Sequence, residues 1–412
     1  MTTVTAETAP RSAFREVWLI SAGHMMTHWY PATFYLLLPL IGKELGLSFG
    51  QIGSILTCQF TAGALSNLPG GMVVDAIGRK ALLMAVALSW IGLPYLMMGF
   101  SHSYWMLLVC ATMVGIGNNL WHPTAIPLLA QNHPDRRGLV VSIHAMGGNL
   151  GDAVAPLAVG AMLTVFSWRD VVVMNVVPGV AASMLLLLSL GRIDDGRGIE
   201  PDRPSAPRRG ALDVFAGVRM LFANRTVLML SLGSAVRSMT AMTLLTFLPV
   251  FLSNELGYPP AWVGGSLFAL QAAGFAAAPV SGYLSDRMGR RSIIMTSMAM
   301  SCVVLLFMAF AGRSPAFVLF VAFLGFFLFA IRAVLQAWLL DATPRHLGGT
   351  SVGIMFGAQA VGAAIGPLIG GLIADHYGII ATFYYLAATI VVANLFIFFT
   401  PPTPAESRTA TA

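Results

Sequence analysis

The sequence predicts an all-α membrane protein with about 12 transmembrane helices, arranged as two six-helix repeats around a central cavity. Three observations predict this fold: an apolar composition, a series of uncharged runs, and motifs that recur at one fixed displacement. Of the 412 residues, 57% are hydrophobic and 10% are charged. A soluble domain carries about 25% charged residues, so this chain has too few to cover a surface in water.

The uncharged runs have the length of membrane spans. Residues 171–190 and 379–399, for example, contain no charged side chain. About 20 helical residues, at 1.5 Å each, cross the hydrocarbon core of a bilayer. From hydropathy we expect spans near residues 16–41, 50–74, 81–100, 105–130, 138–166, 171–191, 227–252, 260–284, 292–311, 316–340, 350–373 and 379–400.

Basic residues fall mainly on one side of these spans. Only Lys43, Arg169 and Arg313 fall on the opposite side, and two arginines lie within spans. The positive-inside rule therefore predicts that both termini lie in the cytoplasm. We expect the protein in the bacterial inner membrane. The net charge of +6 then faces anionic lipid, and we expect no nucleic-acid partner. Because no nucleotide-binding loop, metal cluster or nucleophile elbow occurs, we expect that the chain is not an enzyme.

Two halves are related by a constant displacement. The motif Gly-x3-Asp-x2-Gly-Arg-Lys/Arg begins at Gly71 and again at Gly282, which lies 211 residues later. Residues 151–156 and 362–367 repeat a Gly-x4-Pro pattern at the same displacement. We therefore expect an N-terminal six-helix half (1–191), a cytoplasmic linker (192–226) and a C-terminal six-helix half (227–412).

The doubled loop motif resembles the signature loop of the major facilitator superfamily. The resemblance covers nearly the whole chain and implies a monomeric transporter, with a substrate site between the halves and no cofactor beyond the proton gradient. It also implies a conformational latch, in which the carboxylate of Asp75 meets a helix N-terminus in one state. The alternative is a pair of solvated loops. The latch residues are Gly71, Asp75, Gly78, Arg79, Lys80, Asp286, Gly289 and Arg290.

Ionisable residues inside spans are functional candidates, because burying them in a membrane is unfavourable. They occur on the helices that the resemblance places around the cavity. Asp152 is the only acid that we expect to be buried within a span. We expect Asp152, together with His28 and His24, to carry a coupled proton. The alternative is a structural ion pair of Asp152 with Arg237 or with a histidine.

Two arginines within spans outnumber this one acid. Arg237 and Arg332 therefore favour an anionic substrate, since a guanidinium group fits a carboxylate, phosphate or phosphonate. The alternative is a hydrogen-bonded lock between helices. The other residues that we expect to bind substrate are His122, His144, Asn118, Asn119, Asn149 and Gln336.

His24 and His28 lie four residues apart on one helix face, a spacing that metal ligands often have. No Cys, Asp or Glu joins them on the same span, and the arginines would repel a cation. We therefore expect no metal site, and we assign the pair to the cavity wall or to a proton relay.

Helices 5 and 11 carry glycine-rich packing motifs. Helix 11 has the complete Gly-x3-Gly-Pro-x2-Gly-Gly pattern of proton-driven exporters, whereas Ala155 and Val159 interrupt it in helix 5. Small residues at four-residue spacing allow close helix approach. The expected packing residues are Gly151, Pro156, Gly362, Gly366 and Pro367.

A narrower resemblance is to the fosmidomycin-resistance-type efflux proteins. It depends on residues 115–123, 137–151 and 371–376. It departs at Thr124, where an acid is expected, and at Asp152 and Arg332, which are particular to this chain. Fosmidomycin is a phosphonate, in agreement with a cationic cavity. The sequence thus favours a proton-coupled antiporter that exports small anionic compounds or drugs. A proton-coupled importer of an organic anion and a non-transporting sensor or scaffold remain as alternatives.

Overall fold

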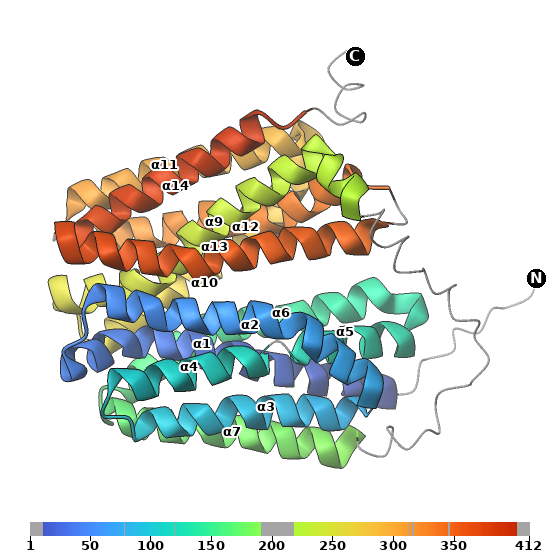
Figure 1. Ribbon diagram of the computed structural model, residues 1–412, viewed down its shortest axis with the longest axis horizontal. Helices are drawn as coiled ribbons and strands as arrows, with labels where there is room; N and C mark the ends of the chain where they lie inside the picture. Colours follow the sequence, from blue (N-terminus) through green and yellow to red (C-terminus); the bar gives the residue numbers. More distant parts are fainter. Residues whose placement is uncertain are drawn as a thin grey trace, which may run out of the picture.

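The computed structural model describes residues 11–190 and 218–401, apart from 78, 119, 313, 315, 316, 345 and 346. The described chain forms two helical bundles that lie side by side (Figure 1). The predicted linker, 192–226, lies mostly outside the described residues.

The N-terminal bundle is built from α1 (Arg11–Leu45), α2 (Phe49–Ile77), α3 (Lys80–Gly99), α4 (Tyr104–Asn118), α5 (Trp121–Asn132), the short 3-10 helix η1 (Pro134–Arg136), α6 (Arg137–Met162) and α7 (Trp168–Leu190). The C-terminal bundle is built from α9 (Arg225–Val250) with its π-helical extension η2 (Phe251–Glu255), α10 (Pro260–Met288), α11 (Arg290–Ala311), α12 (Phe317–Asp341), α13 (Gly348–Tyr377) and α14 (Ile379–Phe398).

Eight of the described helices are long and apolar enough to cross a membrane, and they include every long helix of the C-terminal bundle. In the N-terminal bundle, α3 and α7 are the two that qualify among the described residues. The other predicted spans correspond to α1, α2, α6 and the α4–α5 pair, where many of the polar candidate residues lie. α4 and α5, with 15 and 12 residues, are each too short to cross a membrane alone.

One predicted span is interrupted. Residues 105–130 were expected as a single helix, but α4 ends at Asn118 and α5 begins at Trp121. Pro123 lies in the first turn of α5 and has no amide hydrogen to donate toward the preceding turn, so it favours a new helix start. Hydropathy averaged over a window could not detect this break, because the apolar runs on both sides outweigh the few polar residues, Asn118, Asn119 and His122, next to it.

The displacement of 211 residues recurs in the helix bounds. α2 covers 49–77 and α10 covers 260–288, so both their starts and their ends differ by this value. Likewise α6 and α13 begin at 137 and 348. Equivalent helices therefore occupy equivalent positions in the two bundles.

The predicted packing glycines lie where helices of one bundle meet. A Cβ atom on Gly151 of α6 would lie 2.4 Å from the carbonyl oxygen of Met25 on α1. A Cβ atom on Gly362 of α13 would lie 2.0 Å from the carbonyl oxygen of Ala235 on α9. Any side chain at either position would have to push two helix backbones apart.

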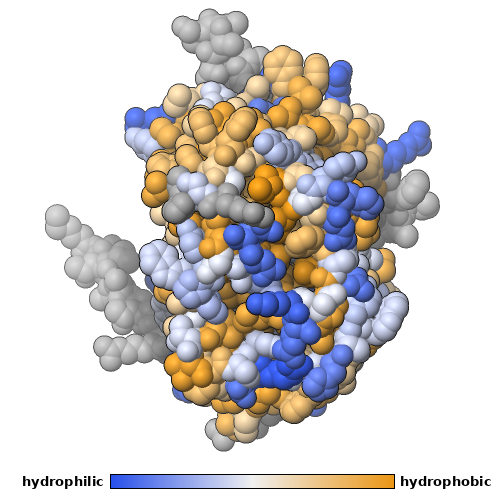
Figure 2. Space-filling model, turned by 90° about the vertical axis from the view of Figure 1, so that its left-hand side faces the viewer, coloured by the Kyte–Doolittle hydropathy of each residue, from blue (hydrophilic) through white to orange (hydrophobic). Residues whose placement is uncertain are grey.

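The bundles contact each other mainly through α2 with α13 and α6 with α10. We name the end where α1 begins and α14 ends the terminal end, and the opposite end the distal end (Figure 1). Figure 2 views the distal end, where hydrophilic residues gather across the middle of the face. Hydrogen bonds that join described residues of the two bundles lie between the middle of the molecule and this end.

Two contacts close the distal end. The carboxylate of Asp375 on α13 accepts hydrogen bonds from the backbone amides of Phe49 and Gly50, each 2.8 Å long. Further inside, the Thr57 hydroxyl on α2 donates to the carbonyl of Ala364 at 2.5 Å. The bundles are thus fastened at one end, and the candidate site lies on the other side of these contacts.

Candidate functional site

Four histidine side chains gather within the N-terminal bundle. His24 lies at their centre: its ring stacks on that of His144, with 3.9 Å between ring centroids, and its Nε2 lies 3.1 Å from Nε2 of His122. The His28 ring meets the His24 ring edge-on, with 4.7 Å between centroids. Helices α1, α5 and α6 therefore bring together residues that lie up to 120 positions apart.

Asp152 pairs with this cluster. Its Oδ2 lies 3.0 Å from Nδ1 of His28, and both side chains are about three-quarters buried, with 26% and 28% exposed. Arg237 forms no ion pair with Asp152 in the part of the chain that the structure describes. A structural ion pair of Asp152 was expected either with Arg237 or with a histidine. The structure contains the pair with a histidine, His28.

The hydrogen bonds of His24 define which nitrogen carries its proton. Nδ1 lies 2.6 Å from the backbone carbonyl oxygen of His144. A carbonyl can only accept a hydrogen bond, so Nδ1 is the donor. In the neutral ring, Nε2 is then unprotonated and presents its lone pair to His122.

Gly148 makes room for the cluster. A Cβ atom at this position of α6 would lie 2.7 Å from Cε1 of His24 and 3.0 Å from Nε2 of His28. Only a residue without a side chain allows both rings to approach α6 so closely. Sequence reasoning did not single out Gly148, although two adjacent glycines within a predicted span are a signal of such an approach.

The C-terminal bundle contributes two cations. Arg237 on α9 is 3% exposed, its Nη1 donates to the carbonyl of Leu328 on α12 at 3.4 Å, and its Nε has no hydrogen-bond partner. Arg332, also on α12, is exposed and interacts electrostatically with both Arg237 and His122. Among the described residues, no acid lies within ion-pair distance of either arginine. Arg332 therefore links the cationic and histidine parts of the site electrostatically.

The remaining predicted substrate-binding residues are distributed around this centre. Asn118 ends α4, and its buried Oδ1 lacks a hydrogen-bond partner. Asn149 and Gln336 are half-buried on α6 and α12, and no hydrogen bond joins them to the histidines. Asn119 lies outside the described residues.

Two further residues belong near the site and were not expected from the sequence. The hydroxyl of Tyr35 lies 3.8 Å from Sδ of Met242 on the other bundle, and Tyr35 also interacts electrostatically with Asp152. Gln359 on α13 donates a 2.6 Å hydrogen bond to Ser234, one turn from Arg237. Tyr35 lies seven residues after His28, and this helical spacing was the signal available in the sequence.

The predicted latch is described in part. Gly78 and the side chain of Asp75 lie outside the described residues. Arg79 is exposed, Gly71 has open space around it, and Lys80 donates to Gln131 at 2.7 Å.

The equivalent loop of the C-terminal bundle forms an ion-pair network. Arg290 pairs with Asp286 at 3.2 Å and with Asp341 on α12. Gly289 precedes it with a φ of 88°, which favours glycine. The network fastens the start of α11 to the end of α12.

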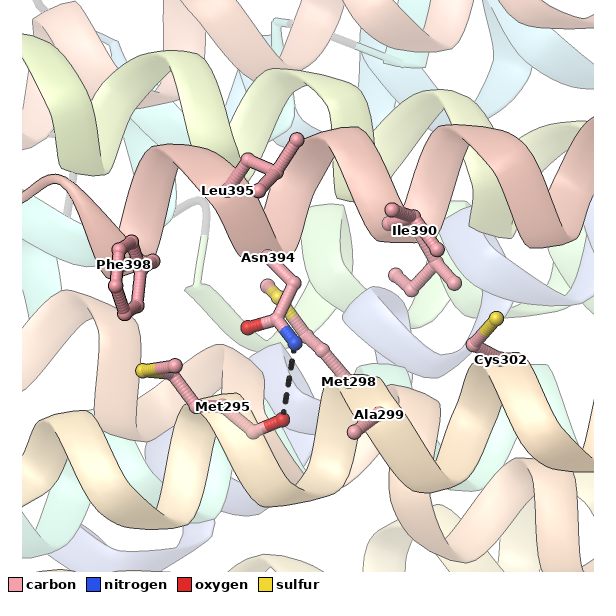
Figure 3. Close-up of a pocket in the computed structure, with 9 residues that line it drawn as sticks. Met295, Met298, Ala299, Cys302, Ile390, Asn394, Leu395 and Phe398 are labelled. Atoms are coloured by element: carbon pink, nitrogen blue, oxygen red, sulfur yellow. Dashed lines mark hydrogen bonds between the residues drawn. The ribbon is translucent and has the colours of Figure 1, made fainter.

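The pocket in Figure 3 lies elsewhere. This cavity of about 280 Å³ lies between α11 and α14 and is lined mostly by apolar side chains. Its amide, Asn394, donates to the carbonyl of Met295 at 3.3 Å. The pocket contains no residue of the candidate site.

Comparisons with known proteins agree with this architecture. A family model described as Major Facilitator Superfamily matches residues 17–277 and 230–412. The fosmidomycin resistance protein of Escherichia coli (strain K12) is 24% identical over 396 residues, covering 96% of this chain and 94% of that protein. The hexuronate transporter of Bacillus subtilis (strain 168) is 24% identical over 370 residues, covering 86% of each chain.

A solved structure shows the same fold. It is the crystal structure of a bacterial homolog to the human lysosomal transporter Spinster, in an inward-facing and unoccupied conformation. It aligns with a TM-score of 0.81 at 16% identity, covering 95% of this chain and 98% of that one. The predicted fold class, two helical bundles of a membrane protein, is confirmed.

Proposed function

This chain belongs to the major facilitator superfamily, and from that premise we propose that it is a proton-coupled exporter of small anionic organic compounds. Its family and relatives make it a multi-pass membrane transporter and not an enzyme. As part of this proposal, the transporter works as a monomer in the bacterial inner membrane. Both its termini lie in the cytoplasm, and the proton gradient is its energy source.

The buried guanidinium of Arg237 carries the proposal of an anionic substrate. Removing a charge from water without a partner is strongly unfavourable, and inside a membrane protein such a group usually serves function. Arg237 has one long hydrogen bond to a carbonyl and an unsatisfied Nε. An oxyanion placed between Arg237 and Arg332 would supply the missing charge and hydrogen-bond acceptors.

The pair of Asp152 and His28 supports a proton-carrying role. A carboxylate next to an imidazole can accept a proton, after which the ionic part of their interaction is lost. His24 and His122 extend this pair by a contact between two nitrogens, which allows a proton to pass between rings. The histidine cluster thus offers a proton site that is separate from the arginines.

The closed distal end supports loading of substrate from the cytoplasm. With the termini in the cytoplasm, the distal end faces away from it, and the contacts of Asp375 and Thr57 block that side. Alternating access then requires these contacts to break while contacts at the terminal end form.

A second candidate is a proton-coupled importer of an organic anion. Arg332 interacts electrostatically with His122. An anion bound at the arginines would offset their charge and so favour protonated histidines, and proton and anion would then move together. The interaction between Arg332 and His122 is thus the observation that favours symport, because it links anion binding to protonation of the histidines.

Proton flux in proteoliposomes separates the candidates. Fosmidomycin, and then a panel of small organic anions, is added outside vesicles that contain a pH-sensitive dye. Protons that leave the lumen as substrate enters would support the exporter, whereas protons that enter with substrate would support the importer. Absence of substrate-dependent flux across the panel would favour a sensor or scaffold.

A further inference from the structure

We propose that His24, His28 and His122 form a binding site for one divalent transition-metal ion of the zinc class. The proposal goes beyond transport and depends on neither its direction nor its substrate. A bound ion would occupy the same Nε2 atoms of His24 and His122 that the proposed function uses to pass a proton, so the ion and the proton would compete for the cluster. Its basis is the geometry of three imidazoles, together with the groups that hold them.

The three side chains each offer one ligand nitrogen, and these nitrogens lie within 4.8 Å of one another. Two imidazole nitrogens bound at about 2.0–2.1 Å to one tetrahedral zinc ion lie about 3.3–3.4 Å apart. The Nε2 atoms of His24 and His122 are 3.1 Å apart, close to that separation. A small inward movement of His28 would complete a three-nitrogen site.

In His24 and His28, the ring nitrogen that would not bind the metal, Nδ1, already contacts a carbonyl or carboxylate oxygen, as it does in known metal sites. Nδ1 of His24 donates to the carbonyl of His144, and Nδ1 of His28 lies 3.0 Å from the Asp152 carboxylate. Metal-bound histidines almost always donate their other nitrogen to a carbonyl or carboxylate, which fixes the tautomer and raises ligand basicity. Both arrangements leave Nε2 for the metal.

The expectation of no metal had two arguments: no Cys, Asp or Glu joins His24 and His28 on their own span, and the arginines would repel a cation. The first argument considered one helix alone. The third nitrogen instead comes from His122, 98 residues after His24, at the start of α5. The sequence could not place α5 against α1.

Charge also shapes the site. The carboxylate of Asp152 partly offsets a divalent ion, whereas Arg332 interacts with His122 and opposes it. Three protein ligands leave a fourth tetrahedral position for water or an anionic oxygen. The imidazole-only set favours zinc, copper, nickel or iron over magnesium or calcium, which prefer oxygen ligands.

The test uses the full chain without an affinity tag, purified in lipid nanodiscs. Zn²⁺ binding is measured by competition with a chromophoric chelator, and Co²⁺ binding by visible absorption. We expect one ion per chain and a four-coordinate Co²⁺ spectrum. We expect Asp152→Asn to weaken Zn²⁺ binding by about 10- to 100-fold, and His122→Gln to weaken it by more.

The matched control is His144→Phe, which keeps the stacked ring and the backbone carbonyl but removes two ring nitrogens. It should bind Zn²⁺ as the unaltered protein does. If His122→Gln fails to fold, a rise in the melting temperature of the unaltered protein with Zn²⁺ but not with Mg²⁺ still tests the site.

Three outcomes would overturn the proposal: no Zn²⁺ binding by the unaltered protein, binding that His122→Gln leaves unchanged, or a Co²⁺ spectrum typical of six-coordinate aqueous ions. None of these readouts involves transport. A failure here would therefore leave the proposed function untouched, and absence of proton flux would leave the metal site untouched.

Discussion

Asp375 on α13 caps the first turn of α2 in the other bundle, with its Oδ2 2.8 Å from the amide nitrogen of Gly50. The helix N-terminus attracts the carboxylate through its free amides and its dipole. The contact thus joins the two halves by charge as well as by packing, at the end where the bundles are closed.

We expect Asp375→Ala to shift the protein toward a state that is open at the distal end. Loss of a capping side chain costs about 1 kcal/mol, which corresponds to roughly a fivefold change in the ratio of states. Spin labels on the distal ends of α2 and α13 would measure the distance distribution. His376→Gln, at the neighbouring position, is the control, and an unchanged distribution in Asp375→Ala would contradict the gating role.

We expect Asp152→Asn to abolish substrate-linked proton movement. The amide can still hydrogen-bond to His28 but cannot ionise, so the fold is retained while the proton site is lost. The proteoliposome dye assay checks this, with the exposed Asp135→Asn as control. Normal proton flux in Asp152→Asn would place the coupled proton on another group.

We expect Arg237→Met to abolish transport while leaving the melting temperature unchanged or higher. The substitution removes a buried charge that has no acidic partner. The free energy needed to remove this charge from water no longer destabilises the folded state. If Arg237 were a structural lock between α9 and α12, the melting temperature would fall instead. Arg225→Met, at the exposed start of the same helix, is the control for thermal unfolding and for flux.

We expect Gly148→Ala to destabilise the N-terminal bundle by about 1–3 kcal/mol, the usual effect of overpacking. The new methyl group would collide with the rings of His24 and His28. Gly138→Ala is the matched control on the same helix, because a Cβ atom there has nothing within 4 Å. Equal stabilities of the two variants in chemical denaturation would show that the rings can move aside.

The sequence predicted the fold because its signals are local and repeated. Uncharged runs identify spans without knowledge of their neighbours, and the displacement of 211 residues follows from the chain alone. Asp152 and Arg237 were also predictable as candidates, because an ionisable residue within a span is conspicuous. For these features, position along the chain carries all the information needed.

Partners between helices could not be predicted in the same way. Nothing in the spacing of Asp152 distinguishes His28 from Arg237 as its neighbour, and only the packing of α1 on α6 decides this. The same holds for His122, which reaches His24 because α5 packs against α1. Asp375 was visible in the sequence, but its role depends on α2, more than 300 residues away.

The protonatable residues and the two arginines lie on different halves of the molecule. Under the proposed function, this separation makes the protein modular: Asp152 and the histidines that would carry the proton belong to the N-terminal half, and the arginines that would hold an anion belong to the C-terminal half. Over generations, the C-terminal half could be remodelled for new compounds while the N-terminal half kept its machinery. Chimeras that join this N-terminal half to the C-terminal half of a relative should then inherit their ion dependence from one parent and their cargo from the other.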